Sequence, residues 1–425
     1  MFDIIIIGAG PAGMMAAISA ASESHSQDKK LSLALFEANP HPGRKLLLSG
    51  NGQCNITNTD DHEEFLAHYG SRKQGRFLRH AFYAFDNLAV RAFLHDLHLS
   101  TVARPDGKVF PASYAATDVL EVMTDAMERL GVELFMRSRV VSVSFDTGRT
   151  FSVSAVSGNG TMHSHAATAL IIATGGSSYA GTGSTGDGYR FAKELGHRIV
   201  PTRPALCGIS IGGYPLAHLT GVSLESVTMG VWRRGRKVVS YRGDLLFTHT
   251  GFSGPVVMNN SRDLQRGDEV TFDFSGMGSE CRPFITGYCG DHAGSRIVSL
   301  LKHLGLPRSL SLALLEIAEL SPEQHCGELG RRRAGTLCSI LTDYRFPVAS
   351  AGKYSSAMVT AGGVALDEVD PASMASRVTA GLYFAGEVLD IDGDTGGYNI
   401  QAALSTGAAA GRAAAAYCRA ADSRR

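Results

Sequence analysis

The stretch that decides the fold is FDIIIIGAGPAG, residues 2–13. It opens with an apolar run of the kind that forms a strand buried on both faces of a parallel sheet. A G-x-G-x-x-G pattern follows at Gly8, Gly10 and Gly13, and residues 14–22 then have helical composition. In this motif the first glycine allows a tight turn, the second lets the backbone approach a pyrophosphate, and the third permits close helix–strand packing. The sequence therefore predicts a Rossmann-type dinucleotide site at a helix N-terminus.

An acid at the end of the second predicted strand supports the same interpretation. Residues 31–37 (LSLALFE) form that strand, and Glu37 ends it. A carboxylate in this place accepts hydrogen bonds from the adenosine ribose hydroxyls. It disfavours a phosphorylated ribose, so we expect FAD or NAD here and not NADP. A glycine-rich turn without a nucleotide is the alternative, and the strand, the helix and the acid together weigh against it.

Glycine-rich loops follow further predicted parallel strands, at the edge where such sheets bind ligands. Residues 43–57 (GRKLLLSGNGQCNIT) carry Arg44 and Lys45, which would neutralise a diphosphate, and their glycines would let the loop skirt a flat ring. Gly386–Glu387 ends a buried strand, and residues 396–400 (GGYNI) lead into an Ala-rich helix. The first amides of that helix would face the flavin N1/O2 edge, where a helix N-terminus stabilises the anionic reduced ring.

Changes of texture along the chain predict a dinucleotide domain that is split in sequence. Short β-like segments such as RKVVSY begin near residue 199, helical patterns such as SLALLEIAEL follow, and the first texture returns at residue 359. Residues 162–165 and 169–173 are expected as two separate strands. The predicted α/β organisation places the first part of the FAD domain at 1–196, an inserted β-rich domain at 197–280, a helical subdomain at 281–345, a return through the β-rich domain at 346–357, and the second part of the FAD domain at 358–425.

The composition limits the partners and the location. Lys+Arg and Asp+Glu balance at 40 each in 425 residues, so the overall charge argues for neither a nucleic acid nor a membrane. Seven scattered cysteines include no C-x-x-C pair, which fits a reducing compartment and predicts no metal site. No stretch approaches the ~18 apolar residues that span a bilayer, and the N-terminus lacks the features of a signal peptide. We expect a cytoplasmic protein without membrane contact.

Two further motifs are interpreted as decoys. Residues 181–186 (GTGSTG) repeat the G-x-G-x-x-G pattern, but no strand leads directly into them, so they are expected to shape a substrate-side loop and a helix at 187–195. Residues 390–394 (DIDGD) imitate the start of a calcium loop. Thr395 and Gln401 stand where such a loop needs glycine and glutamate, so the match fails.

The chain resembles a known family along most of its length. The segments GAGPAGMMAA, GRKLLLSGNGQCNITN, IATGGSSYAGTGSTGDGYRFAKELGH, LLFTHTGFSGP and YFAGEVLDIDGDTGGYNIQAALSTG are similar to the BaiN/RdsA-type (YhiN-like) NAD(P)/FAD-dependent oxidoreductases, from residue 1 to about 415. The resemblance implies a glutathione-reductase-like FAD fold with a β-barrel-like insertion and a helical subdomain. It also implies reduction of a carbon–carbon double bond conjugated to a carbonyl, in an oxo-bile acid or in a uridine of 23S ribosomal RNA.

The predicted FAD contacts combine the motifs with this resemblance. The resemblance implies contacts at Gly8, Gly10, Pro11, Ala12, Gly13, Glu37, Lys45, the backbone of Val140, Thr174, Gly175, Gly386, Glu387, Asn399 and Ile400. The predicted set further includes Arg44, Asn55 and Gly397. NADH or NADPH is expected as a transient electron donor.

The catalytic candidates are loop residues with groups that can donate a proton. Reduction of an enone needs a general acid or an electrophile beside the substrate. Cys54, Tyr398 and His249 lie in loops that could serve, although a small buried cysteine often only packs and His249 could simply cap a turn. The main hypothesis is an NAD(P)H-driven FAD reductase of a small enone or of ribosomal RNA. The alternatives are an amine (aminoacetone-type) oxidase, which is an older label of the family, and a non-catalytic FAD-binding sensor.

Overall fold

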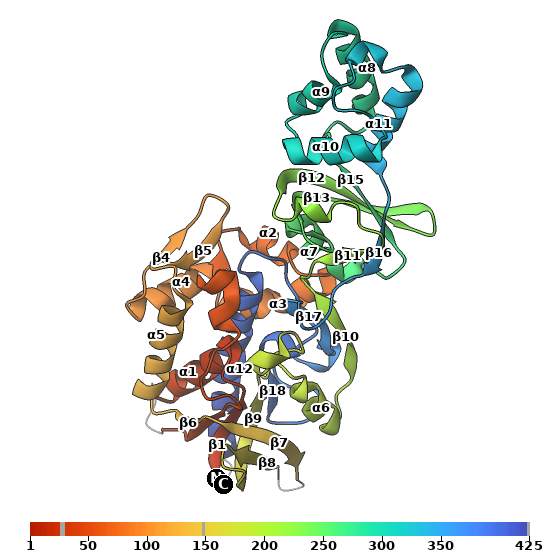
Figure 1. Cartoon of the computed structure of the whole chain (residues 1–425). Coiled ribbons are helices and arrows are strands. Elements are labelled where there is room, and N and C mark those ends of the chain that lie inside the picture. The colour runs from red at the N-terminus through yellow and green to blue at the C-terminus, as the bar shows by residue number, and fades with distance from the viewer. Residues whose placement is uncertain (26–29, 147–148, 423–425) are drawn as a thin grey trace. The chain divides into compact units, whose positions relative to one another are not determined.

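The computed structural model describes residues 1–25, 30–146 and 149–422. The chain divides into two compact units (Figure 1). The first unit combines residues 1–204 with residues 357–425, and the second unit is residues 205–356. Each unit has its own hydrophobic core. The finer division of the inserted segment at residues 280 and 345 stays a prediction.

A seven-stranded sheet forms the centre of the first unit. Its order is β6-β2-β1-β9-β8-β7, with β18 also paired to β9. Ile4 to Ile7 of β1 are at most 5% exposed, because β2 and β9 flank this strand in parallel and helices cover the sheet. The strands are β1 Phe2–Ile7, β2 Leu33–Phe36, β6 Glu133–Phe135, β7 Ser138–Phe145, β8 Phe151–Ser157, β9 Met162–Ile172 and β18 Leu382–Phe384.

Strand β9 differs from the prediction of two strands. It is one continuous strand, and its two halves have different partners on one edge: residues 162–167 pair antiparallel with β8, and residues 170–172 pair parallel with β18. The change of partner explains why its exposed first half and its buried second half have different sequence patterns.

Two small sheets complete the unit. One is made of β3 Thr57–Asn58, β4 Thr101–Ala103 and β5 Lys108–Pro111, and the other of β10 Ile199–Ala205 and β17 Val359–Val364.

Helices α1 and α12 pack against each other beside this sheet (Figure 1). A Cβ atom on Gly407 would lie 2.4 Å from the carbonyl oxygen of Ala12, and one on Gly411 would lie 2.2 Å from that of Ala16. These two glycines therefore bring the last helix close to the first. The helices of the unit are α1 Pro11–His25, α2 His62–Ala67, α3 Arg72–Ala84, α4 Asn87–Asp96, α5 Ala116–Arg129, α6 Asp187–Glu194 and α12 Tyr398–Asp422.

The second unit is a closed β-barrel with a helical region. The barrel order is β11-β14-β13-β12-β15-β16, which agrees with the expected barrel-like insertion. Its strands are β11 Ile209–Ile211, β12 Ser223–Arg233, β13 Arg236–Phe247, β14 Gly251–Ser253, β15 Glu269–Asp273 and β16 Phe346–Ser350. Its helices are α7 Pro255–Met258, α8 Cys281–Asp291, α9 Ile297–His303, α10 Arg308–Ile317 and α11 Arg331–Asp343. Across the described ranges of the chain, no helix has the length and apolar character needed to cross a membrane.

Candidate functional site

The glycine turn after β1 has the geometry of a pyrophosphate cradle. Gly8 has φ +102°, and a Cβ atom there would lie 2.5 Å from the carbonyl oxygen of Ala173. A Cβ atom on Gly13 would lie 1.9 Å from the carbonyl oxygen of Gly8, so this glycine is needed for the protein's own packing. At Gly10, by contrast, a Cβ atom would have no atom of the described residues within 4 Å, apart from its own chain neighbours. The space beside Gly10 is where a dinucleotide would pass the start of α1.

Glu37 lies beside this turn. Its Oε2 atom accepts a hydrogen bond from the backbone N–H of Ala9 at 2.9 Å, and its Oε1 atom accepts from the backbone and side-chain nitrogens of Asn39 at 2.9 and 2.7 Å. Arg44 in turn donates to the side-chain oxygen of Asn39 at 2.8 Å. These bonds orient the carboxylate at the end of β2, where an adenosine ribose binds in Rossmann sheets. Asn39 was not identified from the sequence.

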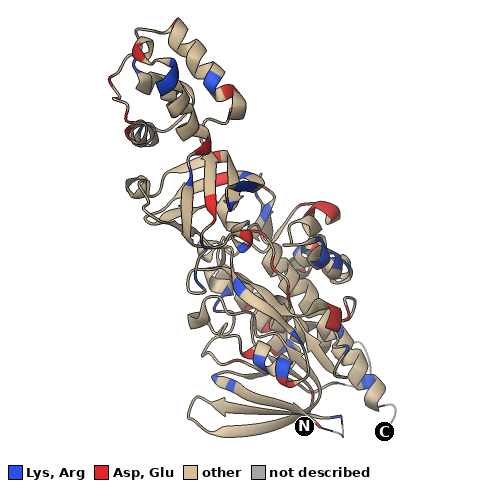
Figure 2. Ribbon diagram, turned by 90° about the vertical axis from the view of Figure 1, so that its right-hand side faces the viewer, with Lys and Arg blue, Asp and Glu red and all other residues tan. Residues whose placement is uncertain are grey.

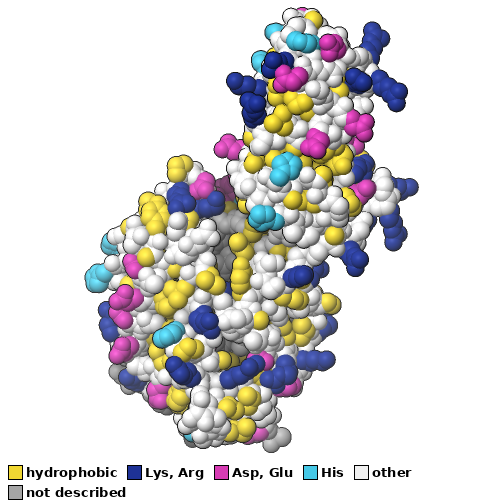
Figure 3. Space-filling view, in the orientation of Figure 1, with side chains coloured by type: hydrophobic (Ala, Val, Ile, Leu, Met, Phe, Trp, Pro, Cys, Tyr) yellow, Lys and Arg dark blue, Asp and Glu magenta, His cyan; other side chains and the backbone are white. Residues whose placement is uncertain are grey.

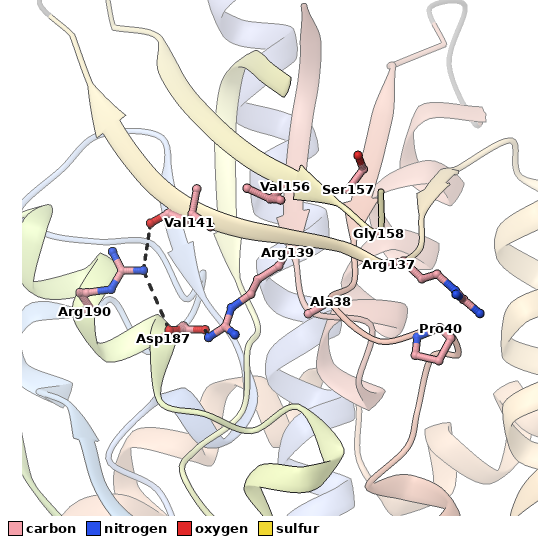
Figure 4. A pocket seen from close by; sticks show the side chains of 10 residues that line it. All are labelled: Ala38, Pro40, Arg137, Arg139, Val141, Val156, Ser157, Gly158, Asp187 and Arg190. Atoms are coloured by element: carbon pink, nitrogen blue, oxygen red, sulfur yellow. Dashed lines mark hydrogen bonds and ion pairs between the residues drawn. The ribbon is translucent and has the colours of Figure 1, made fainter. Parts of the chain in front are cut away.

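Ala38, which follows Glu37 in the sequence, lines an open cavity of about 730 Å³ (Figure 4). Within it, Arg139 forms an ion pair with Asp187 at 2.8 Å, and Arg190 donates to the carbonyl oxygen of Val141 at 3.0 Å. The cavity adjoins Glu37 through Ala38 and flanks Val140, so its position fits the adenosine end of the dinucleotide. Ten residues line it: Ala38, Pro40, Arg137, Arg139, Val141, Val156, Ser157, Gly158, Asp187 and Arg190.

Lys45 and Glu387 join two of the predicted cofactor loops. Lys45 Nζ lies 2.8 Å from Glu387 Oε2, and Glu387 Oε1 accepts from the backbone N–H of Thr360 at 2.8 Å. Both ionic side chains are largely buried, with 26% of Lys45 and 20% of Glu387 exposed. Nearby, the buried hydroxyl of Thr174 has no hydrogen-bond partner within the described part of the chain. This hydroxyl faces the start of α6, because a Cβ atom on Gly188 would lie 2.0 Å from it.

The N-terminus of α12 is held close to strand β3. Gly397 has φ +101°, and a Cβ atom there would lie 2.4 Å from the carbonyl oxygen of Thr57. The side-chain amide of Asn55 forms hydrogen bonds through both its oxygen and its nitrogen in one of its two orientations. In that orientation its oxygen accepts from the backbone N–H of Gly397 at 3.1 Å. The Asn399 side chain closes the preceding loop by accepting from the backbone N–H of Gly393 at 2.8 Å. The backbone of Asn399 and Ile400 therefore starts a helix whose first amides have no intrahelical acceptors.

The catalytic candidates fall into different surroundings. Cys54 is fully buried, and burial raises the pKa of its thiol to about 12. Tyr398 is buried, and its hydroxyl donates to Asp60 Oδ2 at 2.5 Å; burial is the main cause of its raised pKa. His249 belongs to the second unit, where its Nδ1 atom lies 3.1 Å from the hydroxyl of Thr220. The roles of all three stay predictions.

The first unit thus brings together the glycine turn, Glu37, the Lys45 loop, Gly386 and the start of α12. A Rossmann sheet with these loops at its ligand-binding edge defines an FAD-dependent oxidoreductase. A family model described as the HI0933-like protein Rossmann domain matches residues 2–413. The chain belongs to this HI0933-like family.

Relatives of known function match nearly the whole chain. It is 31% identical to the ribosomal RNA dihydrouridine synthase of Escherichia coli. The alignment runs over 413 residues and covers 95% of this chain and 96% of the relative. It is 30% identical to the 3-dehydro-bile acid delta(4,6)-reductase of Clostridium scindens. The alignment runs over 424 residues and covers 98% of this chain and 99% of the relative. The two identities differ by one percentage point, so sequence identity does not favour either relative.

Solved structures share the fold. A 3-ketosteroid-delta4-(5alpha)-dehydrogenase from Rhodococcus jostii matches with a TM-score of 0.53 at 15% identity, covering 97% of this chain and 96% of that chain. An Escherichia coli quinol fumarate reductase matches with a TM-score of 0.51 at 17% identity, covering 99% of this chain and 71% of that chain. At such low identity the likeness concerns architecture alone.

Proposed function

We propose that this protein is an NAD(P)H-driven, FAD-dependent reductase of a carbon–carbon double bond activated by a carbonyl group. The observation that carries the proposal is the dinucleotide cradle of the first unit, in a chain that is 31% identical to a dihydrouridine synthase and 30% identical to a bile acid reductase. One relative is named for making dihydrouridine and the other for reducing a dehydro-bile acid, and both names describe saturation of a double bond. Ribosomal RNA and NAD(P)H both occur in the cytoplasm, where we expect this enzyme.

The residues of the chain have separate tasks in this proposal. Bound FAD would supply the hydride chemistry. The space beside Gly10 takes the pyrophosphate, Lys45 neutralises part of its charge, and the first turn of α12 stabilises negative charge on the reduced ring. Burial raises the pKa of the Cys54 thiol to about 12, and a fully buried thiol that is so hard to ionise is a poor general acid, so we do not assign proton donation to it.

A basic hairpin in the second unit favours ribosomal RNA as the substrate. Arg234, Arg236 and Lys237 lie at the turn between β12 and β13, all are exposed, and no carboxylate in the described ranges pairs with them. Arg233 beside them is instead anchored by Asp268 at 2.8 Å. Strands β12 and β13 are labelled in Figure 1, Figure 2 colours the Lys and Arg positions of the second unit blue, and Figure 3 shows Lys and Arg side chains on the surface of this unit. Unpaired cations on a projecting turn suit contact with phosphates.

Neutralising this hairpin is expected to weaken binding of a 23S ribosomal RNA fragment. The variant Arg234→Gln/Arg236→Gln/Lys237→Gln should lower the affinity by about tenfold or more and reduce the slope of log K against log salt by about 2. Filter binding at several salt concentrations measures both quantities. The matched control, Arg234→Lys/Arg236→Lys, keeps the charge and should bind like the wild type.

Unchanged RNA affinity and salt slope in the neutralised variant would overturn the role of the hairpin. If the protein reduced a 3-oxo-4-ene steroid and did not bind RNA, the proposed reductase activity would stand and its substrate would be a small enone. Flavin reduction by a small amine with release of peroxide would instead establish an amine oxidase. A protein that binds FAD but turns over none of these compounds would be a sensor.

A further inference from the structure

A cluster of four side chains lies where the loop before α12 meets the segment after α2. We name it the His68 cluster, and its members are Asp60, His68, Asp394 and Tyr398. His68 Nδ1 lies 3.0 Å from Asp394 Oδ2, and His68 Nε2 lies 3.6 Å from Asp60 Oδ2. The imidazole ring stacks on the ring of Tyr398, with centroids 4.2 Å apart and planes 21° apart. Tyr398 donates its hydroxyl to the same Asp60 oxygen.

The cluster connects directly to the start of α12. Tyr398 is the first residue of that helix, and its carbonyl oxygen accepts from the hydroxyl of Tyr69 at 2.9 Å. The backbone N–H of Asp394 donates to the carbonyl oxygen of His68 at 2.9 Å. Asn399 spans the loop from the other side by donating to the carbonyl oxygen of Gly393 at 2.9 Å. A change at His68 is therefore transmitted to the first turn of α12 through short, packed contacts.

The surroundings of His68 favour its protonated form. The hydrogen bond with Asp394 raises the pKa of His68 most, burial opposes this, and the charges of Asp394, Asp60 and Glu64 raise the pKa further. Only the imidazolium carries a donor on both ring nitrogens, so only that form can serve the carboxylates on both sides. The side chain is 34% exposed, so it exchanges protons with solvent.

We propose that His68, as the imidazolium, is a positioning residue that holds the first turn of α12 in the orientation that receives the flavin. The proposal rests on the placement of FAD at this helix and is independent of the substrate. Tyr398 connects His68 to the helix, because its ring stacks on the imidazole, its hydroxyl donates to Asp60 and its backbone begins α12.

The sign of the pH effect follows from the direction of the pKa shift. A histidine whose pKa is raised by folding stabilises the folded loop below the unfolded pKa, and this contribution is lost as the pH rises through the folded pKa. In this proposal FAD binds only the ordered loop, so its affinity should fall by roughly fivefold as the pH rises through the folded pKa of His68, the effect of losing one charge-assisted hydrogen bond. The reduction potential of bound FAD should gain a matching pH-dependent step.

The experiment measures the Kd of FAD by flavin fluorescence and its midpoint potential between pH 5.5 and 8.5. We expect the wild type to show an inflection, His68→Gln to show none and to bind FAD roughly fivefold more weakly at low pH, and Asp394→Asn to shift the inflection to lower pH. His62→Gln is the matched control, because His62 pairs with Asp86 at 2.9 Å and its ring packs against Phe82 and Tyr83.

Three results would overturn the proposal. They are identical titrations of wild type and His68→Gln, an inflection that Asp394→Asn leaves in place, or an equal loss in His62→Gln. None of these readouts involves substrate turnover, so failure here leaves the proposed reductase activity standing, and loss of that activity would leave this result standing.

Discussion

Replacing Gly10 with valine is expected to leave the apoprotein folded and to lower FAD affinity by about a hundredfold or more. In the part of the chain that the structure describes, a Cβ atom at this position meets only its chain neighbours within 4 Å, and the backbone there does not have a positive φ. The cost to the apoprotein should be at most about 1 kcal/mol, the effect of a poorer residue before the first turn of α1. The valine side chain would instead fill the space that the pyrophosphate needs. Urea unfolding of the apoprotein and a fluorescence titration with FAD measure the two effects.

Two other glycines provide the controls for this variant. Gly181→Val changes the first glycine of the second G-x-G-x-x-G pattern and should bind FAD normally. A Cβ atom there also has no neighbour within 4 Å among the described residues outside its adjoining positions. Gly13→Ala should destabilise the apoprotein itself by about 1–3 kcal/mol, because its Cβ atom collides with the carbonyl of Gly8. Normal FAD binding by Gly10→Val together with a loss in Gly181→Val would move the dinucleotide to the second motif.

Replacing Glu387 with alanine should cost the apoprotein about 2–3 kcal/mol and weaken FAD binding roughly tenfold. The change leaves the Lys45 ammonium and the backbone N–H of Thr360 without their carboxylate partner in a largely buried place. Lys45 would also lose the group that orients it toward the cofactor. Denaturant unfolding gives the first quantity, and titration with FAD gives the second.

The matched control is Glu194→Ala, which removes a carboxylate from a pair of similar length. Arg190 and Glu194 lie 3.0 Å apart, but their side chains are 45% and 42% exposed, so the loss should stay below about 0.5 kcal/mol. Equal effects of the two substitutions would mean that the Lys45–Glu387 pair is an ordinary surface contact.

The parts of the fold that the sequence predicts are those that depend on neighbouring residues. The strand, turn and helix of residues 2–22 are encoded by a local apolar run and three glycines. Glu37 could be identified because it stands at the end of the next apolar strand. Strand β9 was predicted as two pieces because its edge partner changes from β8 to β18 midway. Only the tertiary arrangement supplies those partners.

The unpredicted parts of the site depend on contacts between distant segments. His68 and Asp394 are 326 positions apart, and Lys45 and Glu387 are 342 apart. Asp394 lies in a segment that resembled a calcium loop, so its pairing with a histidine had no local signal. In the cavity of Figure 4, Arg139 of β7 and Arg190 of α6 likewise come from distant segments of the chain. A spacing pattern cannot encode contacts that form only when the sheet assembles.

The measurement that tests the central claim most directly is the visible spectrum of the FAD-loaded protein during anaerobic addition of NADH and then of NADPH. Bleaching of the oxidised flavin band by one of these donors, followed by its return when an activated alkene is added, is the result that we expect. A band that neither nicotinamide changes, in protein that retains its FAD, would contradict an NAD(P)H-driven reductase.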